Sequence, residues 1–335
     1  MKIIAYGVRD DELPYFTSWA QHQKIEVKVV TDELTMSNVD QANGFDGIII
    51  VYQKKPFTAE LIDKIDSLGI KAISSRNAGI DNIDLRALAK NGMQLTNVPA
   101  YSPGAIAEFS VTQALNLLRK TKVFSNKVQE GDFLWAPDIA DELSQQTVGV
   151  VGTGRIGQAA IKIYQGFGAK VLAYDVFQNP DLVKKGLYVN TLTELYQKAD
   201  ILTLHIPATE DNKYLLDAVA FNNMKKGIKI INAARGSLVD TEELIKALDS
   251  KKVSGAAIDV YENESEIFNR KFSNFSEISD KRLQNLIRRD NVLITPHIAF
   301  YTQPAVRNMV KISLDNNLQL IKTGVADNLV TLPKD

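Results

Sequence analysis

The sequence predicts an α/β protein with two domains, each built on a doubly wound parallel β-sheet. Short apolar runs alternate with helical patterns along the chain, and this alternation is typical of parallel sheets covered by helices. A glycine-rich strand–loop–helix pattern, VGVVGTGRIG, begins only at Val148, so a separate domain is expected before it. A length of 335 residues with 45% hydrophobic side chains is sufficient for two cores.

The first domain is expected to take its strands from KIIAYG, IEVKVV, GIIIV, KAIS and MQLTNV, which begin at residues 2, 25, 47, 71 and 93. After Val98 the pattern changes. A helix with Pro103 in its first turn, capped by Ser102, is expected to cross into the second domain.

The second domain is expected to continue from VGVVG with KVLAYD, ILTLHI, IKIINAA, VSGAAIDV and NVLITPH, which begin at residues 170, 201, 228, 253 and 291. Residues 262–289 are charged and predict an irregular surface excursion. The helix after the glycine loop is expected to present one apolar face, made of Ile156, Ala160, Ile163 and Phe167. A helix over 302–322 is expected to cross back to the first domain, with an apolar stripe of Val306, Val310, Leu314, Leu318 and Ile321.

Composition and charge exclude several classes of function. A net charge of -1 with 24% charged residues provides no basic field for nucleic acid or an anionic membrane, and no apolar run approaches membrane-spanning length. The absence of cysteine excludes disulfides, thiolate metal sites and a cysteine nucleophile, and no metal site is predicted. The N-terminal MKIIAYG is typical of a first strand rather than a signal peptide, so a cytoplasmic protein is expected.

The glycine-rich pattern predicts a dinucleotide site. Gly152 permits a tight turn, Gly154 lets the backbone approach a pyrophosphate, and Gly157 lets the helix pack closely on the strand. Asp175 ends the next strand, where a carboxylate accepts both adenosine ribose hydroxyls and repels a 2′-phosphate. The spacing favours NAD over NADP, and a solvated strand end is the simpler alternative for Asp175.

Histidine is the side chain best suited to proton transfer near neutral pH, and the chain has three. His205 and His297 each follow a strand of the second domain, whereas His22 lies in a polar helix. Ligands bind at the carboxyl ends of parallel strands. His297 and His205 are therefore the candidates for the acid/base.

Three charged residues also follow strands of this sheet. Arg235 comes after IKIINAA, where a guanidinium can hold a substrate carboxylate or form a structural ion pair. Asp259 and Glu264 follow the next strand. A carboxylate beside an imidazole stabilises the imidazolium and fixes its orientation, although an isolated acid in a loop is more simply a solvated residue.

Characteristic stretches run along nearly the whole chain: RNAGIDNID from Arg76, NVPAYSPGAIAE from Asn97, VGVVGTGRIGQ, GFGAKVLAYD, LHIPAT, INAARGSLVDT, AIDVYENE and NVLITPHIAFYT. Together they resemble the D-2-hydroxyacid dehydrogenase family, and within it the NAD-dependent enzymes that reduce pyruvate to D-lactate. By this resemblance His297 is the acid/base, Glu264 pairs with its imidazole, and Arg235 binds the substrate. The resemblance also implies NAD contacts at Arg155, Ile156, Asp175, Ile206, Pro207, Asn212, Ala233, Ala234, Arg235 and Asp259.

The same resemblance implies two Rossmann-like or flavodoxin-like domains with a cleft between them. Residues 1–100 and 300–335 are expected to form a discontinuous substrate-binding domain. Residues 101–299 are expected to form the NAD-binding domain inserted into it. A homodimer formed through the NAD-binding domain is implied as well.

The resemblance further implies a small substrate pocket. The backbone amides of Ala78 and Gly79 are expected to bind the substrate carboxylate opposite Arg235. Tyr52 and Phe300 are expected to leave room for little more than a methyl group, which favours pyruvate, and Tyr101 is expected to lie close to the same cleft.

Several alternatives remain open for the substrate and for the function. Tyr52 and Phe300 could be core aromatics, and Gly104 departs from the asparagine frequent in the lactate enzymes. The other functions considered are a D-2-hydroxyisocaproate-type enzyme acting on larger 2-oxo acids, a phosphoglycerate dehydrogenase and an NAD-sensing corepressor. A phosphoglycerate dehydrogenase is expected to carry extra cationic residues and often a C-terminal regulatory domain, whereas this chain ends at Asp335.

Overall fold

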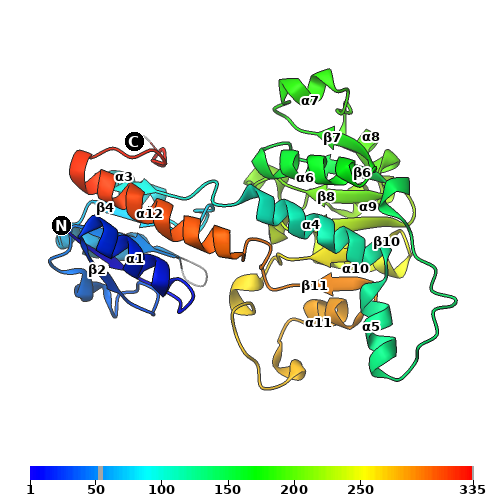
Figure 1. Cartoon of the computed structure of the whole chain (residues 1–335), viewed down its shortest axis with the longest axis horizontal. Helices are drawn as coiled ribbons and strands as arrows, with labels where there is room; N and C mark the ends of the chain where they lie inside the picture. The colour runs from blue at the N-terminus through cyan, green and yellow to red at the C-terminus, as the bar shows by residue number, and fades with distance from the viewer. Residues whose placement is uncertain (52–55, 334–335) are drawn as a thin grey trace. The chain divides into compact units, whose positions relative to one another are not determined.

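The computed structural model describes residues 1–51 and 56–333, and the chain folds into two compact units (Figure 1). Unit 1 comprises Met1–Ser102 and Tyr301–Asp335, and unit 2 comprises Pro103–Phe300. Each unit contains one sheet, and the strands of both sheets are parallel throughout. The predicted fold class is confirmed.

The sheet of unit 1 has the strand order β2-β1-β3-β4-β5, which is the flavodoxin-like order. Its strands are β1 Lys2–Ala5, β2 Glu26–Val29, β3 Gly47–Ile50, β4 Ala72–Ser75 and β5 Gln94–Thr96. Its helices are α1 Leu13–Gln23, α2 Ala59–Ser67, α3 Leu85–Lys90 and α12 Gln303–Thr323, with a 3₁₀ turn at Val39–Ala42.

Both faces of this sheet are buried, because successive side chains of a strand point to opposite sides. Ile3 packs with Phe16 of α1 and Leu314 of α12 in one cluster, and Figure 1 shows α1 and α12 together over this face. Ile4 packs with Ile62 of α2 in the cluster on the other face. The unit is therefore a three-layer sandwich.

Helix α12 returns the chain to unit 1 and begins within one residue of the predicted position. Of the five residues of the predicted stripe, Val306, Val310, Leu314 and Leu318 are buried, and Ile321 is partly buried against the same cluster. Asn317 adds a polar attachment that the pattern does not predict. Its buried Nδ2 donates to the carbonyl oxygens of Ile48 and Ala72, at 3.1 and 3.2 Å, which fixes the helix to β3 and β4.

The sheet of unit 2 has the order β11-β10-β9-β8-β6-β7. Its strands are β6 Thr147–Val151, β7 Lys170–Tyr174, β8 Ile201–Leu204, β9 Ile228–Asn232, β10 Val253–Ile258 and β11 Val292–Ile294. β7 and β8 flank β6 on opposite sides. The direction of the winding therefore reverses at β6, and ligands bind at such a switch point.

The helices of unit 2 cover its sheet on both faces (Figure 1). The α-helices of this unit are α4 Pro103–Leu118, α5 Thr121–Gln129, α6 Arg155–Gly166, α7 Pro180–Lys184, α8 Leu192–Lys198, α9 Ala218–Asn223, α10 Thr241–Asp249 and α11 Lys281–Arg288, of which α5 buries none of its side chains. Short 3₁₀ turns lie at Leu143–Gln145, Glu210–Asn212, Gly236–Leu238, Glu264–Glu266 and Phe275–Glu277.

Two expectations for this unit are wrong. The buried face of α6 consists of Gly157, Ala160, Ile161 and Tyr164, whereas Phe167 is 49% exposed. The face is rotated because α6 packs against small residues of α4 such as Ala107 and Ala114. The 262–289 segment also contains a helix, α11, which buries Leu283 and Leu286.

No helix within residues 1–51 and 56–333 is both long and apolar enough to cross a membrane.

Candidate active site

The carboxyl ends of the unit 2 strands are aligned at one edge of the sheet. The register pairs Asn232 of β9 with Ile258 of β10, and Ile258 with Ile294 of β11. In the other direction Asn232 pairs with Leu204 of β8, and Leu204 with Val151 of β6. The loops that follow these strands therefore leave from the same edge. They carry the glycine motif, His205, Arg235, Glu264 and His297.

The glycine loop connects β6 to α6 in the form that a dinucleotide requires. Gly152 has a φ of +93°, and a Cβ there would lie 2.5 Å from the carbonyl oxygen of His205. A Cβ on Gly157 would lie 2.0 Å from the Gly152 oxygen, whereas a Cβ on Gly154 would meet nothing within 4 Å. The loop is thus compact on its inner side and open at Gly154, where the first turn of α6 begins. A pyrophosphate fits this arrangement of backbone N–H groups.

Asp175 lies beside this loop, because Val151 pairs with Tyr174 at the end of β7. Its Oδ2 accepts hydrogen bonds from the N–H and Oγ1 of Thr153, at 2.6 and 2.9 Å, and its Oδ1 accepts from the N–H of Phe177. These contacts orient the carboxylate and leave lone pairs for ribose hydroxyls. The sequence did not indicate Thr153 as the residue that holds Asp175.

The other predicted NAD contacts lie in loops of the same edge. Arg155 and Ile156 occupy the first turn of α6, and Ala233 and Ala234 follow β9. Ile206, Pro207 and Asn212 follow β8. The Asn212 side chain closes this last loop by accepting from the Thr209 N–H at 2.7 Å and donating to the Pro207 oxygen at 2.9 Å.

Arg235 lies in the loop after β9 and is partly buried. The Asn232 side chain holds this loop by donating to the Arg235 oxygen at 2.9 Å and accepting from the Ala234 N–H at 3.1 Å. A Cβ on the following Gly236 would lie 2.1 Å from the carbonyl carbon of Tyr261. The loops after β9 and β10 are therefore in direct backbone contact.

His297 and Glu264 form a hydrogen-bonded pair. The distance from His297 Nδ1 to Glu264 Oε1 is 2.7 Å, and an ionised carboxylate only accepts, so Nδ1–H donates. Glu264 is held in turn through Oε2, which accepts from the Tyr261 N–H at 2.8 Å. The side chains of His297 and Glu264 are 39% and 29% exposed. Nε2 remains as the ring nitrogen for exchange of a proton with a substrate.

The backbone of His297 is strained, with a φ of +57°, a region that non-glycine residues seldom occupy. Its N–H donates to the Asp259 oxygen at 2.7 Å. The buried Asp259 carboxylate accepts from Thr295 Oγ1 at 2.6 Å and from the N–H groups of Ile298 and Ala299 at 2.9 Å. Asp259 therefore directs its carboxylate into the loop that carries His297. This role was not predicted for it.

Phe300 also lies near the catalytic candidate, since its ring meets the His297 ring edge to face with centroids 6.2 Å apart. The other two histidines have different surroundings. Burial lowers the pKa of His205 to about 4, so its ring is neutral near pH 7, and its Nε2 lies 3.0 Å from Thr203 Oγ1. Its backbone lies directly against Gly152 of the glycine loop. His22 is exposed on α1.

The remaining predicted substrate residues belong to unit 1. Ala78 and Gly79 follow β4, and within the described part of the chain their N–H groups donate to no other protein group. The Ala78 oxygen accepts from Asn97 Nδ2 at 2.7 Å, and the Tyr101 oxygen accepts from Asn308 Nδ2 at 2.8 Å. Tyr52 lies outside the described residues.

Comparison with known proteins gives consistent results. Residues 111–299 match the model of the D-isomer specific 2-hydroxyacid dehydrogenase NAD binding domain. The chain is 56% identical over 331 residues to a D-lactate dehydrogenase of Lactiplantibacillus plantarum, covering 98% of this chain and 99% of the relative. It is 57% identical over 330 residues to a D-lactate/D-glycerate dehydrogenase of Pediococcus acidilactici, with the same coverage. Among solved structures, a D-2-hydroxyisocaproate dehydrogenase shares 42% identity with a TM-score of 0.89, over 99% of this chain and 100% of that chain.

The glycine loop provides a direct test of NAD binding. Gly157→Ala is expected to raise the Kd for NADH at least about fivefold, because overpacking of this kind costs about 1–3 kcal/mol. Gly166→Ala, at the end of the same helix, is the control, since its Cβ would meet nothing within 4 Å. Fluorescence titration with NADH measures both variants, and equal Kd values would contradict the assignment of the loop.

Proposed function

The chain belongs to the D-isomer specific 2-hydroxyacid dehydrogenase family, and from this premise we propose that it is an NAD-dependent D-lactate dehydrogenase that reversibly reduces pyruvate. The observation that carries the proposal is the His297–Glu264 pair, at 2.7 Å, in loops of the NAD-binding sheet. The printed names of the relatives support D-lactate as the product. The same names, which are those of dehydrogenases, disfavour the corepressor alternative.

In the proposed mechanism His297 donates a proton from Nε2 to the carbonyl oxygen of the 2-oxo acid. Glu264 fixes the ring through Nδ1 and balances the positive charge of the protonated imidazole. NADH, when bound, supplies the hydride that C2 of the substrate accepts. In the reverse direction the neutral imidazole takes the proton from the 2-hydroxyl group.

The substrate carboxylate is proposed to bind Arg235 and the N–H groups of Ala78 and Gly79. A guanidinium binds a carboxylate through two parallel hydrogen bonds, and it also stabilises negative charge that develops on the carbonyl oxygen. Tyr101, Phe300 and Tyr52 are proposed to limit the side chain of the substrate. The edge-to-face contact of Phe300 with His297 supports its share of this role.

A panel of 2-oxo acids with NADH, followed at 340 nm, tests the proposal. Pyruvate is expected to give the highest kcat/KM and the D isomer of lactate as product. Hydroxypyruvate and 2-oxoisocaproate belong in the panel, because relatives are named for D-glycerate and D-2-hydroxyisocaproate. A clear preference for the branched C6 acid would replace pyruvate with the hydroxyisocaproate alternative, and a lack of turnover on every acid would refute the enzyme class.

His297→Gln is expected to lower kcat by about 10²–10⁴, because the glutamine amide cannot supply the proton. The Kd for NADH should stay within about twofold, since the binding residues for NAD lie in other loops. His22→Gln, an exposed histidine on α1, is the matched control and should leave kcat unchanged. Near-normal turnover in His297→Gln would refute the acid/base role.

A homodimer formed through unit 2 is also part of the proposal. Large apolar residues are exposed in the segment after α5: Phe133, Leu134, Trp135 and Ile139, at 77%, 71%, 79% and 87%. Such clusters are typical of protein interfaces. Lys127 and Asp132 hold the segment in place through hydrogen bonds to the backbone of Leu134, so the apolar side chains are presented by an ordered loop.

The double variant Phe133→Ser/Trp135→Ser is expected to weaken the dimer by at least about tenfold in Kd, since buried aromatic anchors contribute about 2 kcal/mol or more. Light scattering across a dilution series measures the mass of the particle. Val219→Ser is the control, because Val219 is 65% exposed on α9. A wild-type monomer, or an unchanged dimer in the double variant, would contradict the proposal.

A further inference from the structure

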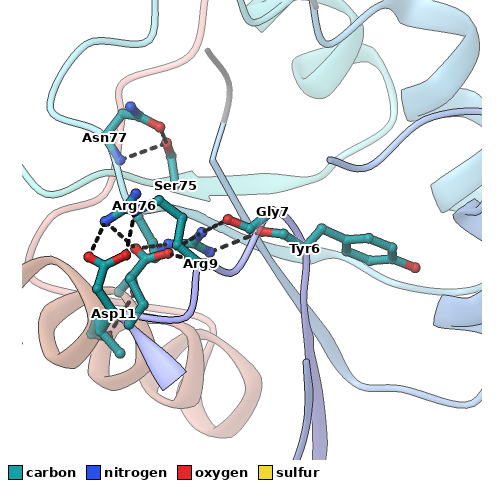
Figure 2. A network of polar contacts seen from close by, with 10 residues as sticks. Tyr6, Gly7, Arg9, Asp11, Ser75, Arg76 and Asn77 are labelled. Carbon is teal, nitrogen blue, oxygen red and sulfur yellow. Dashed lines mark hydrogen bonds and ion pairs between the residues drawn. The ribbon is translucent and has the colours of Figure 1, made fainter. Parts of the chain in front are cut away.

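Arg76, directly after β4, is a fully buried cation with no role in the proposed mechanism. Its Nε and Nη2 donate to the two carboxylate oxygens of Glu12, at 3.0 and 3.3 Å. Nη1 donates to the Tyr6 oxygen at 3.1 Å, and Nη2 donates to the Gly7 oxygen at 2.7 Å. The side chains of Arg76 and Glu12 are both 0% exposed. Figure 2 shows the guanidinium reaching the carbonyl groups of Tyr6 and Gly7.

A buried ion pair of this kind adds little net stability, because removing both charges from water costs several kcal/mol per ion. Apolar side chains of similar volume stabilise a fold as well or better. The pair instead fixes the relative positions of the segments that it joins. Arg76 donates four hydrogen bonds to Tyr6, Gly7 and Glu12. These bonds fix the start of the loop after β4 relative to the loop after β1.

Arg9 and Asp11 form a second group of charges beside this pair. The Arg9 N–H donates to Glu12 Oε2 at 3.0 Å, and its Nη2 lies 3.4 Å from Oε1. The Arg9 guanidinium also binds Asp11 at 3.0 Å and lies 5.6 Å from the centre of the Tyr301 ring. The network therefore joins three segments of unit 1: the loop after β1, the loop after β4 and Tyr301, which lies just before the Thr302 cap of α12.

The loop that Arg76 begins continues directly into Asn77, Ala78 and Gly79. On the far side this loop is held by the Val98 N–H, which donates to the Asn77 oxygen at 3.0 Å, and by Asn97 Nδ2 on the Ala78 oxygen. The contacts that hold this loop use its carbonyl oxygens on one side and the side chain of Arg76 on the other. The N–H groups of Ala78 and Gly79 therefore remain available to a ligand. A pair of backbone donors fixed in this way is preorganised for an anion.

We propose that Arg76, held by Glu12, is a positioning residue that sets the backbone of 77–79 for the substrate carboxylate. The inference rests on the proposed function, because it takes that carboxylate as the ligand of the loop. Arg76 touches no reacting atom. Its effect is exerted through the two N–H groups that follow it.

The test compares three variants of the whole chain. Glu12→Leu/Arg76→Met removes both charges, so no unpaired ion is left in the interior. Arg76→Lys keeps the charge but loses the planar fork that reaches Glu12 and two carbonyl groups. Lys71→Gln is the control, because it removes an exposed ion pair with Asp66 at the other end of β4.

The double variant is expected to stay folded and to show a KM for pyruvate at least about tenfold above wild type, since weakened carboxylate binding acts on ground and transition states alike. The KM for NADH and the kcat should stay within about threefold. Arg76→Lys should give an intermediate KM, and Lys71→Gln a normal one. A double variant that is less stable but has a normal KM for pyruvate would overturn the proposal.

Hydrogen exchange of the amides of 77–81 gives a readout that does not need turnover. In the double variant these amides are expected to exchange at least about tenfold faster, while those of unit 2 are unchanged. Unchanged exchange in 77–81 would refute the positioning role, even if the enzyme is active. If the wild-type chain reduces no 2-oxo acid but residues 77–81 exchange faster in the double variant, the proposed function is refuted and the positioning role is retained. If the double variant does not fold, the KM for pyruvate and the hydrogen exchange of residues 77–81 are measured in Arg76→Lys instead, and the same outcomes support or refute the proposal.

Discussion

The candidate active site depends on the register of the parallel strands in the sheet of unit 2. Because β6, β8, β9, β10 and β11 end opposite one another, loops from distant parts of the sequence leave the sheet at a single edge. Each loop then needs only a short path to bring its functional side chain to the site. A slip of one residue in any strand would reverse the faces of its side chains and shift its loop. The apolar side chains on both faces of the sheet prevent this slip.

Close backbone contacts fix the positions of the loops that leave the sheet at this edge. Gly157 lets α6 approach the glycine loop, and Gly236 lets the Arg235 loop touch the one that carries Glu264. His297 has a left-handed backbone conformation, which costs about 1–3 kcal/mol. The three hydrogen bonds accepted by the buried Asp259 carboxylate offset that strain. The imidazole is therefore fixed from two directions, by Glu264 through the ring and by Asp259 through the backbone.

Sequence patterns predict the strands well, because an apolar run between turn residues is a local signal. The glycine motif, Asp175 and the residues that follow each strand are predictable for the same reason. The contacts between loops are not. Nothing near Asp259 shows that its carboxylate turns inward, and the rotated face of α6 depends on α4. Arg76 is the clearest case: a cation within a run of loop residues predicts exposure, and its partner Glu12 lies 64 positions away.

The Arg76–Glu12 and His297–Glu264 pairs differ in the way that their proposed roles require. The Arg76–Glu12 pair is 0% exposed on both sides, whereas His297 and Glu264 are 39% and 29% exposed. A group that exchanges protons must reach the substrate, and its charge must change at low cost, which partial hydration permits. A group that only fixes a backbone benefits from a dry environment, because an Arg–Glu pair without access to water has no competing partner for its hydrogen bonds. The same chemistry of cation and carboxylate thus suits the two proposed roles, proton transfer at the sheet of unit 2 and rigid placement of a binding loop in unit 1, and burial distinguishes them.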